Sequence, residues 1–254
     1  MSPSIDLREN REFASELKFV VSHSLAEQIR DWARARLAPD PNASGESSDV
    51  YQITSLYFDT KQFDVFHRRG LFGRSKYRIR RYGASEVAFL ERKLKTRGLV
   101  SKRRTVVGLA ELQRLTDAEP DPGWIGYWYQ QRLLARRLNA VCQISYRRIA
   151  RVAMSPSGPV RLTLDDNVRA RAAAGLAFNG GAEGLLLSEN RTVIEMKYRL
   201  EMPQVFKQLV EEFLLNPQPI SKYRLAAVAL EYVKESAPGN FSKGRLDSPL
   251  CLTF

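Results

Sequence analysis

Charged residues alternate with other residues along several segments of this chain that have the composition of β-strands. Cations occupy every second position of segment 76–80, namely Lys76, Arg78 and Arg80. The same spacing recurs in pairs of a glutamate and a lysine, which are Glu16 and Lys18, Glu91 and Lys93, and Glu195 and Lys197. Side chains two residues apart on a strand lie on one face of a sheet. Cations and a few carboxylates on an enclosed face could bind a polyanion together with its metal ion.

The alternation alone allows two arrangements of the sheet. In the first, the charged face of an antiparallel sheet is turned to water, and the glutamate–lysine pairs are exposed ion pairs that contribute little stability. In the second, the sheet closes around its charged face, and helices cover the apolar face outside. Lysine and arginine dominate the charged positions, and apolar residues such as Leu17, Phe19 and Ile194 fill the alternate ones. This composition favours the second arrangement, but the sequence leaves open whether the glutamates form ion pairs with lysines or hold a divalent metal ion.

The composition indicates a soluble protein with an anionic partner. The 254 residues include 40 Lys and Arg against 28 Asp and Glu, and the net charge of +12 does not distinguish nucleic acid, acidic lipid, nucleotide or polyphosphate. Cys142 and Cys251 form no zinc or redox motif, which favours a reducing compartment. No apolar run approaches the roughly 18 residues of a membrane span, and residues 1–11 lack the apolar core of a signal peptide. We therefore expect a cytoplasmic protein.

Common catalytic and phosphate-binding motifs are absent from the sequence. Residues 70–73 lack the Lys and Ser/Thr that complete a phosphate-binding loop, and no dinucleotide-binding fingerprint is present. Ser221 precedes Lys222, but this pair is weak evidence for a catalytic nucleophile. His23 and His67 have no ligand-spaced partners, so we assign them structural roles. Phosphate binding by this chain must therefore depend on side chains rather than on backbone amides.

We expect one α+β domain over residues 12–235, with tails at 1–11 and 236–254. Alternating and β-branched segments predict strands at 16–21, 50–59, 75–82, 87–95, 100–107, 140–152, 160–165 and 192–200. Apolar spacing predicts helices at 24–36, 109–116, 125–138, 203–215 and 221–233. Ser24 and Glu27 have the spacing of a capping box, and loops are expected at 38–49 and 175–184.

Eight segments of the chain together resemble the VTC domain, the polyphosphate polymerase branch of the triphosphate tunnel metalloenzymes in the CYTH-like superfamily. Each segment is weak evidence alone, but their order and their extent, from about Glu16 to Tyr232, make the resemblance specific. The segments are 16–19 (ELKF), 55–60 (SLYFDT), 76–83 (KYRIRRYG), 90–93 (LERK), 145–148 (SYRR), 161–165 (RLTLD), 194–197 (IEMK) and 221–223 (SKY).

The resemblance implies a closed eight-stranded antiparallel β-barrel that forms a tunnel, with helices packed outside. It implies catalytic phosphate ligands inside the tunnel, namely Lys18, Arg78, Arg80, Lys93, Lys197 and Lys222. It also implies substrate-binding residues, namely Lys102, Arg148, Arg161 and Ser221. Glu195 is the implied principal metal ligand, supported by Glu16 and Glu91. In this arrangement Arg78 and Arg80 point inward, whereas Tyr77, Ile79 and Arg81 point outward. Tyr82, as a strand neighbour of the cations, is also expected to face the outer core.

The implied activity is transfer of the γ-phosphate of ATP to a growing polyphosphate chain, with Mn²⁺ or Mg²⁺ as the cofactor. Hydrolysis of tripolyphosphate or of a nucleoside triphosphate is the alternative, because the residue types do not distinguish attack by water from attack by phosphate. A non-catalytic module that binds polyphosphate or another polyanion is the third possibility. Nucleic acid is not expected as a partner, since it predicts aromatic residues interleaved with exposed cations.

The chain departs from the eukaryotic pattern of the family. It has neither an N-terminal phosphate-sensing domain nor C-terminal membrane spans. We therefore expect a stand-alone, bacterial form. Protein partners, oligomeric state and the direction in which ATP enters the tunnel are left open by the sequence.

Overall fold

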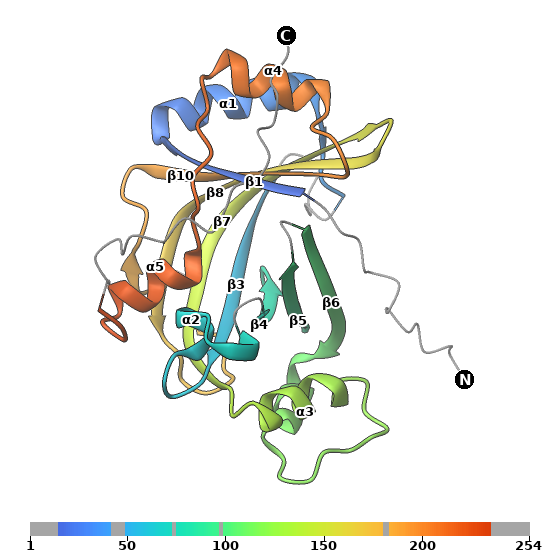
Figure 1. Ribbon diagram of the computed structural model, residues 1–254, viewed down its shortest axis with the longest axis vertical. Helices are drawn as coiled ribbons and strands as arrows, with labels where there is room; N and C mark the ends of the chain where they lie inside the picture. The colour runs from blue at the N-terminus through green and yellow to red at the C-terminus, as the bar shows by residue number, and fades with distance from the viewer. Residues whose placement is uncertain (1–14, 42–48, 73–74, 97–98, 180–182, 235–254) are drawn as a thin grey trace.

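One strongly curved antiparallel sheet organises the chain (Figure 1). The computed structural model describes residues 15–41, 49–72, 75–96, 99–179 and 183–234. Neighbouring strands follow the order β1-β10-β8-β7-β3-β4-β5-β6, while β2 pairs with β7 and β9 pairs with β8. Every ladder is antiparallel. The strand bounds are Ser15–Ser22 (β1), Ala38–Pro39 (β2), Val50–Asp59 (β3), Ser75–Tyr82 (β4), Val87–Thr96 (β5), Leu99–Gly108 (β6), Asn139–Ser155 (β7), Gly158–Ala172 (β8), Leu185–Leu186 (β9) and Arg191–Tyr198 (β10).

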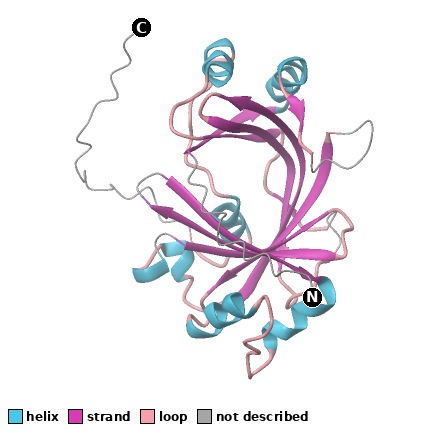
Figure 2. Cartoon of the chain, turned by 90° about the vertical axis from the view of Figure 1, so that its right-hand side faces the viewer, coloured by secondary structure: helices cyan, strands magenta, loops and turns pink. Residues whose placement is uncertain are grey.

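Most helices lie on the outside of this sheet (Figure 2), whereas α5 brings Lys222 to Asp165 on its inner face. Near β1, β10 and β8, helices α1 and α4 pack over an apolar cluster that buries Trp32, Ile194 and Phe206. Near β4 and β5, a second cluster buries Tyr77 and Leu90 with residues of η3 and α3. These clusters form the core and leave the inner face of the sheet to charged residues. The helix bounds are His23–Arg36 (α1), Asp64–His67 (α2), Tyr127–Ala135 (α3), Gln204–Glu212 (α4) and Lys222–Ala229 (α5), with 3-10 helices at Gly70–Phe72 (η2) and Leu109–Thr116 (η3).

The sheet is not closed into a barrel, which corrects the expected eight-stranded closure. Strands β1 and β6 are the two ends of the hydrogen-bonded path, and no ladder joins them within the described residues. Cα atoms of the two strands nevertheless come within 8 Å of one another. The free edge of β1 is already in use, because the backbone N–H of Gln218 donates to the carbonyl of Lys18 at 2.8 Å. The loop after α4 thus occupies a position that a closing strand would need.

Most expected elements are confirmed, with three differences. Helix α1 is capped by Ser22 rather than Ser24, since the Oγ atom of Ser22 accepts a hydrogen bond from the Leu25 backbone N–H at 3.3 Å. Segment 109–116 is a 3-10 helix rather than an α-helix. Strand β8 continues past the expected end at 165, because buried residues resume their alternation at Val168 after Asn167, whose φ is positive.

Two further expectations are limited by the extent of the described chain. The expected tails at 1–11 and 236–254 lie outside the described residues, as do residues 42–48 of the first expected loop. Across the described segments, no helix is long and apolar enough to cross a membrane.

Candidate active site

Strand β4 shows how the alternation of its sequence divides the two faces of the sheet. Tyr77 and Ile79 are fully buried in the apolar core on the outer face, as expected. Arg80 lies on the inner face, is 4% exposed, and donates a hydrogen bond to Tyr146 Oη at 2.8 Å. Arg78 lies on the same face, and its side chain is 19% exposed. The inner face is therefore not an ordinary water-facing sheet surface.

The inner face gathers charged side chains from β1, β4 to β8, β10 and α5 into a set that we call the charged interior. Its cations outnumber its carboxylates, and ion pairs link different elements, including β1 and β5, which are distant in the sheet. The cations are Lys18, Lys76, Arg78, Arg80, Lys93, Lys102, Arg104, Arg148, Lys197 and Lys222, and the carboxylates are Glu16, Glu91, Asp165 and Glu195. Of the residues that the sequence predicted, each one except Arg161 belongs to this set or contacts it.

Arg161 is held at the border of the charged interior. It lies opposite Lys197 in the ladder between β8 and β10, so it shares the inner face. Its Nη2 atom is 2.5 Å from Asp40 Oδ2 and donates a hydrogen bond to Tyr51 Oη at 2.8 Å. Its guanidinium is thus bound to a carboxylate outside the set, and its predicted role as a phosphate ligand stays a prediction.

The glutamates of β1 and β10 lie on either side of one ammonium group. Lys18 Nζ is 3.0 Å from Glu16 Oε1 and 3.2 Å from Glu195 Oε2. Lys93 pairs with the other oxygen of Glu16 at 2.6 Å, and Lys197 pairs with the other oxygen of Glu195 at 2.9 Å. Burial and the second glutamate oppose ionisation of Glu16, but the three ammonium groups outweigh them and lower its pKa to about 2. Both glutamates therefore stay ionised near neutral pH.

Glu91 lies in a separate group of ion pairs and is 1% exposed. Its Oε2 atom accepts a hydrogen bond from Arg78 Nε at 2.6 Å, and its Oε1 atom is 3.1 Å from Arg104 Nε and also contacts Lys102 Nζ. Burial opposes its ionisation, but the surrounding cations lower the pKa of Glu91 well below its usual range. The sequence did not single out Arg104 as a site residue, although it follows Lys102 at a spacing of two.

Asp165 is a fully buried carboxylate that the sequence likewise did not assign to the site. Arg148 donates hydrogen bonds from Nε and Nη2 to its two oxygens, both at 2.6 Å, and Lys222 Nζ donates to Oδ2 at 2.6 Å. Burial raises the pKa of Asp165, but these two cations outweigh it and hold the pKa far below its usual range. The available signal was position, because Asp165 continues the alternation of Arg161 and Thr163 along β8.

A hydrogen-bond network at the end of β3 holds helix α5 in place. Asp59 is fully buried and accepts hydrogen bonds from two backbone N–H groups of α2, at 2.8 and 2.9 Å, and from the hydroxyl of Tyr223. Tyr223 directly follows Lys222 in α5. The network therefore fixes the helix from which the Lys222 ammonium reaches Asp165.

Three lysines lie directly opposite one another on neighbouring strands, namely Lys76 on β4, Lys93 on β5 and Lys102 on β6. Burial and repulsion from nearby cations lower the pKa of Lys76 to about 7. Burial also lowers the pKa of Lys93 to about 8 and that of Lys102 to about 7, against the attraction of neighbouring glutamates. Lys76 donates a hydrogen bond to Ser221 Oγ at 2.7 Å. This row repels its own charge, and a bound polyanion would relieve that repulsion.

Tyrosine hydroxyls complete the surroundings of the arginines. Tyr57 Oη accepts a hydrogen bond from Arg78 at 3.3 Å, and Tyr82 Oη accepts one from Arg104 at 2.8 Å. The expectation that Tyr82 faces the outer core is wrong, because it lies two residues after Arg80 and shares its face. Burial raises the pKa of Tyr82, but the two nearby arginines outweigh it and lower the pKa to about 7.

The divalent metal that the family resemblance implies would need carboxylate ligands. Within the described segments, no group of three or more His, Cys, Asp or Glu side chains could hold a metal ion. Glu16 and Glu195 nevertheless meet at one ammonium group. Mg²⁺ commonly binds through one or two carboxylates together with phosphate oxygens of a substrate. These two glutamates therefore fit a metal that is shared with a phosphate chain, whereas Glu91 lies among three cations elsewhere.

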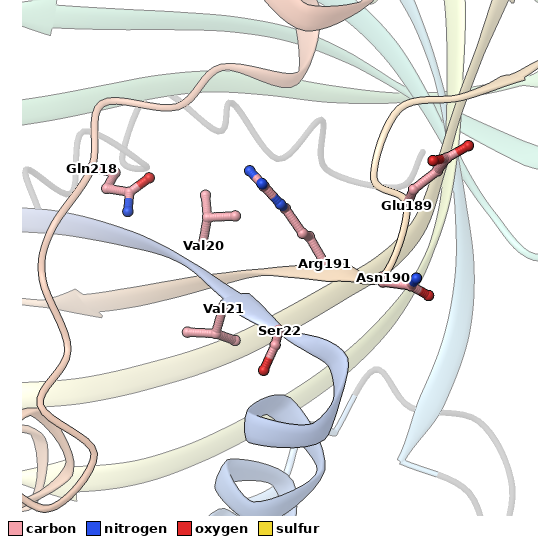
Figure 3. A pocket seen from close by; sticks show the side chains of 7 residues that line it. All are labelled: Val20, Val21, Ser22, Glu189, Asn190, Arg191 and Gln218. Carbon is pink, nitrogen blue, oxygen red and sulfur yellow. The ribbon is translucent and has the colours of Figure 1, made fainter.

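A separate cavity of about 540 Å³ lies where β1 and β10 meet the start of α1 (Figure 3). The described residues that line it include Val20, Ser22, Glu189, Arg191 and Gln218. They come from β1, from the loop before β10, from the first residue of β10 and from the loop before α5. None of the predicted site residues lines this cavity, so the charged interior is the candidate active site.

Solved structures resemble this chain at low sequence identity. A "putative adenylate cyclase" from Bacillus halodurans is 17% identical, with a TM-score of 0.52 over 84% of this chain and 95% of that chain. A "putative adenylyl cyclase" from Hippeastrum, described as having a dominant triphosphatase activity, is 16% identical, with a TM-score of 0.48 over 87% and 95% of the two chains. The PH1819 protein from Pyrococcus horikoshii is 13% identical, with a TM-score of 0.47 over 87% and 99%. The first of these similarities shows a common fold.

The family is shown by the sequence itself. No curated protein matches the chain. The VTC domain, however, matches residues 13–231, which include the whole strand path of the sheet and every residue of the charged interior. The chain therefore belongs to the VTC domain family.

Proposed function

We propose that this protein transfers the γ-phosphate of ATP to the end of a polyphosphate chain, both of which bind in the charged interior. The observation that carries the proposal is the convergence of cations from six strands and α5 on a smaller number of buried carboxylates. Membership of the VTC domain family supports an enzyme that acts on phosphate compounds.

Arg80 is the side chain best placed to bind a phosphate. Its guanidinium is buried, and Nε and Nη2 donate to the hydroxyls of Ser55 and Tyr146. Within the described part of the chain, no carboxylate forms an ion pair with it. A planar guanidinium can donate two parallel hydrogen bonds to a phosphate, which would supply the charge that the hydroxyls lack.

In the proposed reaction the protein mainly positions the reacting phosphates and neutralises their negative charge. A terminal phosphate oxygen of the chain attacks the γ-phosphorus of ATP, and the bond from that phosphorus to the β–γ bridging oxygen breaks. ADP leaves with the electron pair. The attacking oxygen is already anionic near neutral pH, so no general base is required. Arg78 and Arg80 would orient the phosphates, while Lys18, Lys93, Lys197 and Lys222 would offset the repulsion between two polyanions.

Glu195 and Glu16 are the side chains that would hold a divalent ion in the proposed reaction. When bound, Mn²⁺ or Mg²⁺ supplies charge neutralisation on phosphate oxygens. Lys102, Arg148, Arg161 and Ser221 are proposed to bind the substrate, and Glu91 to keep three of the cations in place.

Incubation with ATP and Mn²⁺ tests the proposal, with long-chain polyphosphate and ADP as the expected products on a gel and by chromatography. Arg80→Ala should abolish synthesis while circular dichroism shows a folded protein. Arg81→Ala is the matched control, because Arg81 lies on the other face of β4 and donates to the backbone carbonyls of Ala84 and Ser85. Undiminished synthesis by the Arg80 variant would contradict the proposal.

The products also distinguish the alternatives. Orthophosphate without polymer would identify a tripolyphosphatase or nucleoside triphosphatase. Binding of tripolyphosphate without any turnover would identify a non-catalytic polyphosphate-binding module.

A further inference from the structure

The wall formed by β4, β5 and β6 changes its chemistry from one end to the other. Residues that lie directly opposite one another on neighbouring strands share a face of the sheet. Since Arg78 and Arg80 belong to the inner face, their cross-strand partners do too. Three successive rows cross this face, namely Lys76, Lys93 and Lys102, then Arg78, Glu91 and Arg104, and then Arg80, Phe89 and Val106.

The third row begins an apolar surface that the protein leaves uncovered. Val106 is 39% exposed, and Val87, two residues before Phe89 on the same face, is 36% exposed. Phe89 itself is partly exposed. On the outer face of the same strands, Leu90 and Val107 are buried in the core. The exposed apolar residues therefore lie on the charged side of the sheet, where cations would be expected from the other rows.

Aromatic rings and a guanidinium meet at this surface. The rings of Tyr82 and Phe89 pack edge to face, with centroids 5.3 Å apart. The guanidinium carbon of Arg104 lies 3.6 Å from the centroid of Phe89, while its Nε atom is 3.1 Å from a carboxylate oxygen of Glu91. Arg104 thus joins the apolar surface to the charged interior. An apolar surface therefore lies next to rows of cations. A ligand that carries both a flat apolar group and several phosphates would match this arrangement.

We propose that the surface formed by Tyr82, Val87, Phe89 and Val106 binds the nucleobase of a nucleoside triphosphate. Every base has a flat π-face that can stack on an aromatic ring without base-specific hydrogen bonds. The α-phosphate then lies near Arg80 and Arg104, and the γ-phosphate lies toward the row of three lysines. This inference rests on the proposed function and gives the binding site a direction, because the acceptor chain must enter from the lysine end.

The test compares the Kd values of ATP and inorganic tripolyphosphate by isothermal titration calorimetry. Phe89→Ala should weaken ATP binding about tenfold and change tripolyphosphate binding by less than about twofold, since the latter ligand has no base. Phe89→Trp, unlike Phe89→Ala, should keep the ATP affinity of the unmodified protein, because it offers a larger ring. Lys76→Met should weaken both ligands, whereas Leu134→Ala, an exposed apolar residue on α3, should weaken neither.

Two outcomes would overturn the nucleobase site. Equal weakening of both ligands by Phe89→Ala would mean that the ring only supports Arg104. Unchanged binding of both ligands would mean that the base lies elsewhere. The result is separable from the proposed activity, because polymer synthesis could persist without a base site. A selective loss of ATP binding would conversely stand even if orthophosphate were the only product.

Discussion

Lys93 on β5 and Glu16 on β1 form an ion pair between two strands that lie far apart along the hydrogen-bonded path of the sheet. The Nζ atom of Lys93 lies 2.6 Å from Glu16 Oε2, and the second oxygen of Glu16 is 3.0 Å from Lys18 Nζ. Both partners are mostly removed from water, with side-chain exposures of 27% and 7%. An ion pair thus links β1 to the β5 side of the open sheet, where no backbone ladder joins the described strands β1 and β6.

Replacing Glu16 with Gln should therefore loosen β1. The change leaves Lys18 and Lys93 with one counter-charge fewer in a region that is already rich in cations. We expect the free energy of unfolding to fall by about 1–3 kcal/mol, less than the ~3–5 kcal/mol of a fully buried pair, because Lys93 keeps contact with water. Urea denaturation measures this loss, and amide hydrogen exchange should become faster along β1.

Glu27→Gln is the matched control for this prediction. Glu27 pairs with Arg30 on the surface of α1 and its side chain is 38% exposed, so its loss should cost no more than about 0.5 kcal/mol. Added tripolyphosphate should restore part of the stability of the Glu16 variant, because it supplies negative charge to the same lysines. Equal destabilisation by the two substitutions would argue against a special role of the Lys93 pair.

The row of lysines predicts a pH dependence of stability. The pKa of Lys76 and that of Lys102 are lowered by burial to about 7 from an ordinary value of 10.5. Between these limits the unfolded chain binds more protons than the folded chain, so the free energy of unfolding should rise with pH from about 7 to about 10.5. Urea denaturation at pH 7, 8 and 9 measures this rise. A fall in stability between pH 7 and 8 would contradict it.

The same lysines predict that tripolyphosphate binding takes up protons. An anion beside Lys76 and Lys102 favours their charged forms and raises the pKa of each toward its ordinary value. At pH 8 the complex should therefore bind more protons than the free partners. Calorimetry in buffers of different ionisation enthalpy measures the number of protons. Lys76→Met should reduce the uptake, whereas Lys207→Met, an exposed lysine on α4, should leave it unchanged.

The orientation of β4 could be predicted because a period of two fixes which residues share a face. Arg78 and Arg80 therefore lie opposite Tyr77 and Ile79 regardless of how the sheet curves. Tyr82 obeys the same period, and the expectation that it faces outward was wrong because it treated an aromatic residue as core by type. Position along the strand was the better guide than residue chemistry.

The sequence could not predict which charged side chains form ion pairs, nor whether the sheet closes into a barrel. Closure depends on whether β1 and β6 meet, and the contact of Gln218 with Lys18 that occupies the edge of β1 joins residues about 200 positions apart. Asp165 was visible as a charged position on β8, but its pairing with Arg148 and Lys222 is a tertiary property. With many cations and few carboxylates, alternation cannot assign the pairs.

Removal of one hydroxyl from α5 tests how the helix positions its lysine. Tyr223 donates to Asp59, which is 164 residues away in sequence, and its ring stacks on Tyr57 with centroids 5.5 Å apart. Tyr223→Phe keeps the stacking and removes only the hydrogen bond to a buried carboxylate. We expect the free energy of unfolding to fall by about 1–3 kcal/mol and tripolyphosphate affinity to fall severalfold, since α5 carries Lys222.

The matched control for Tyr223 is Tyr232→Phe. The hydroxyl of Tyr232 donates to the Val141 carbonyl at 3.1 Å from the segment after α5, away from the charged interior. Its loss should cost about 1 kcal/mol and leave tripolyphosphate affinity unchanged. A Tyr223 variant that loses stability but binds tripolyphosphate as tightly as the unmodified protein would show that Lys222 is positioned by its ion pair with Asp165 alone. A loss of affinity confined to the Tyr223 variant would instead assign the Asp59 network a role in binding, because this network positions the helix that carries Lys222.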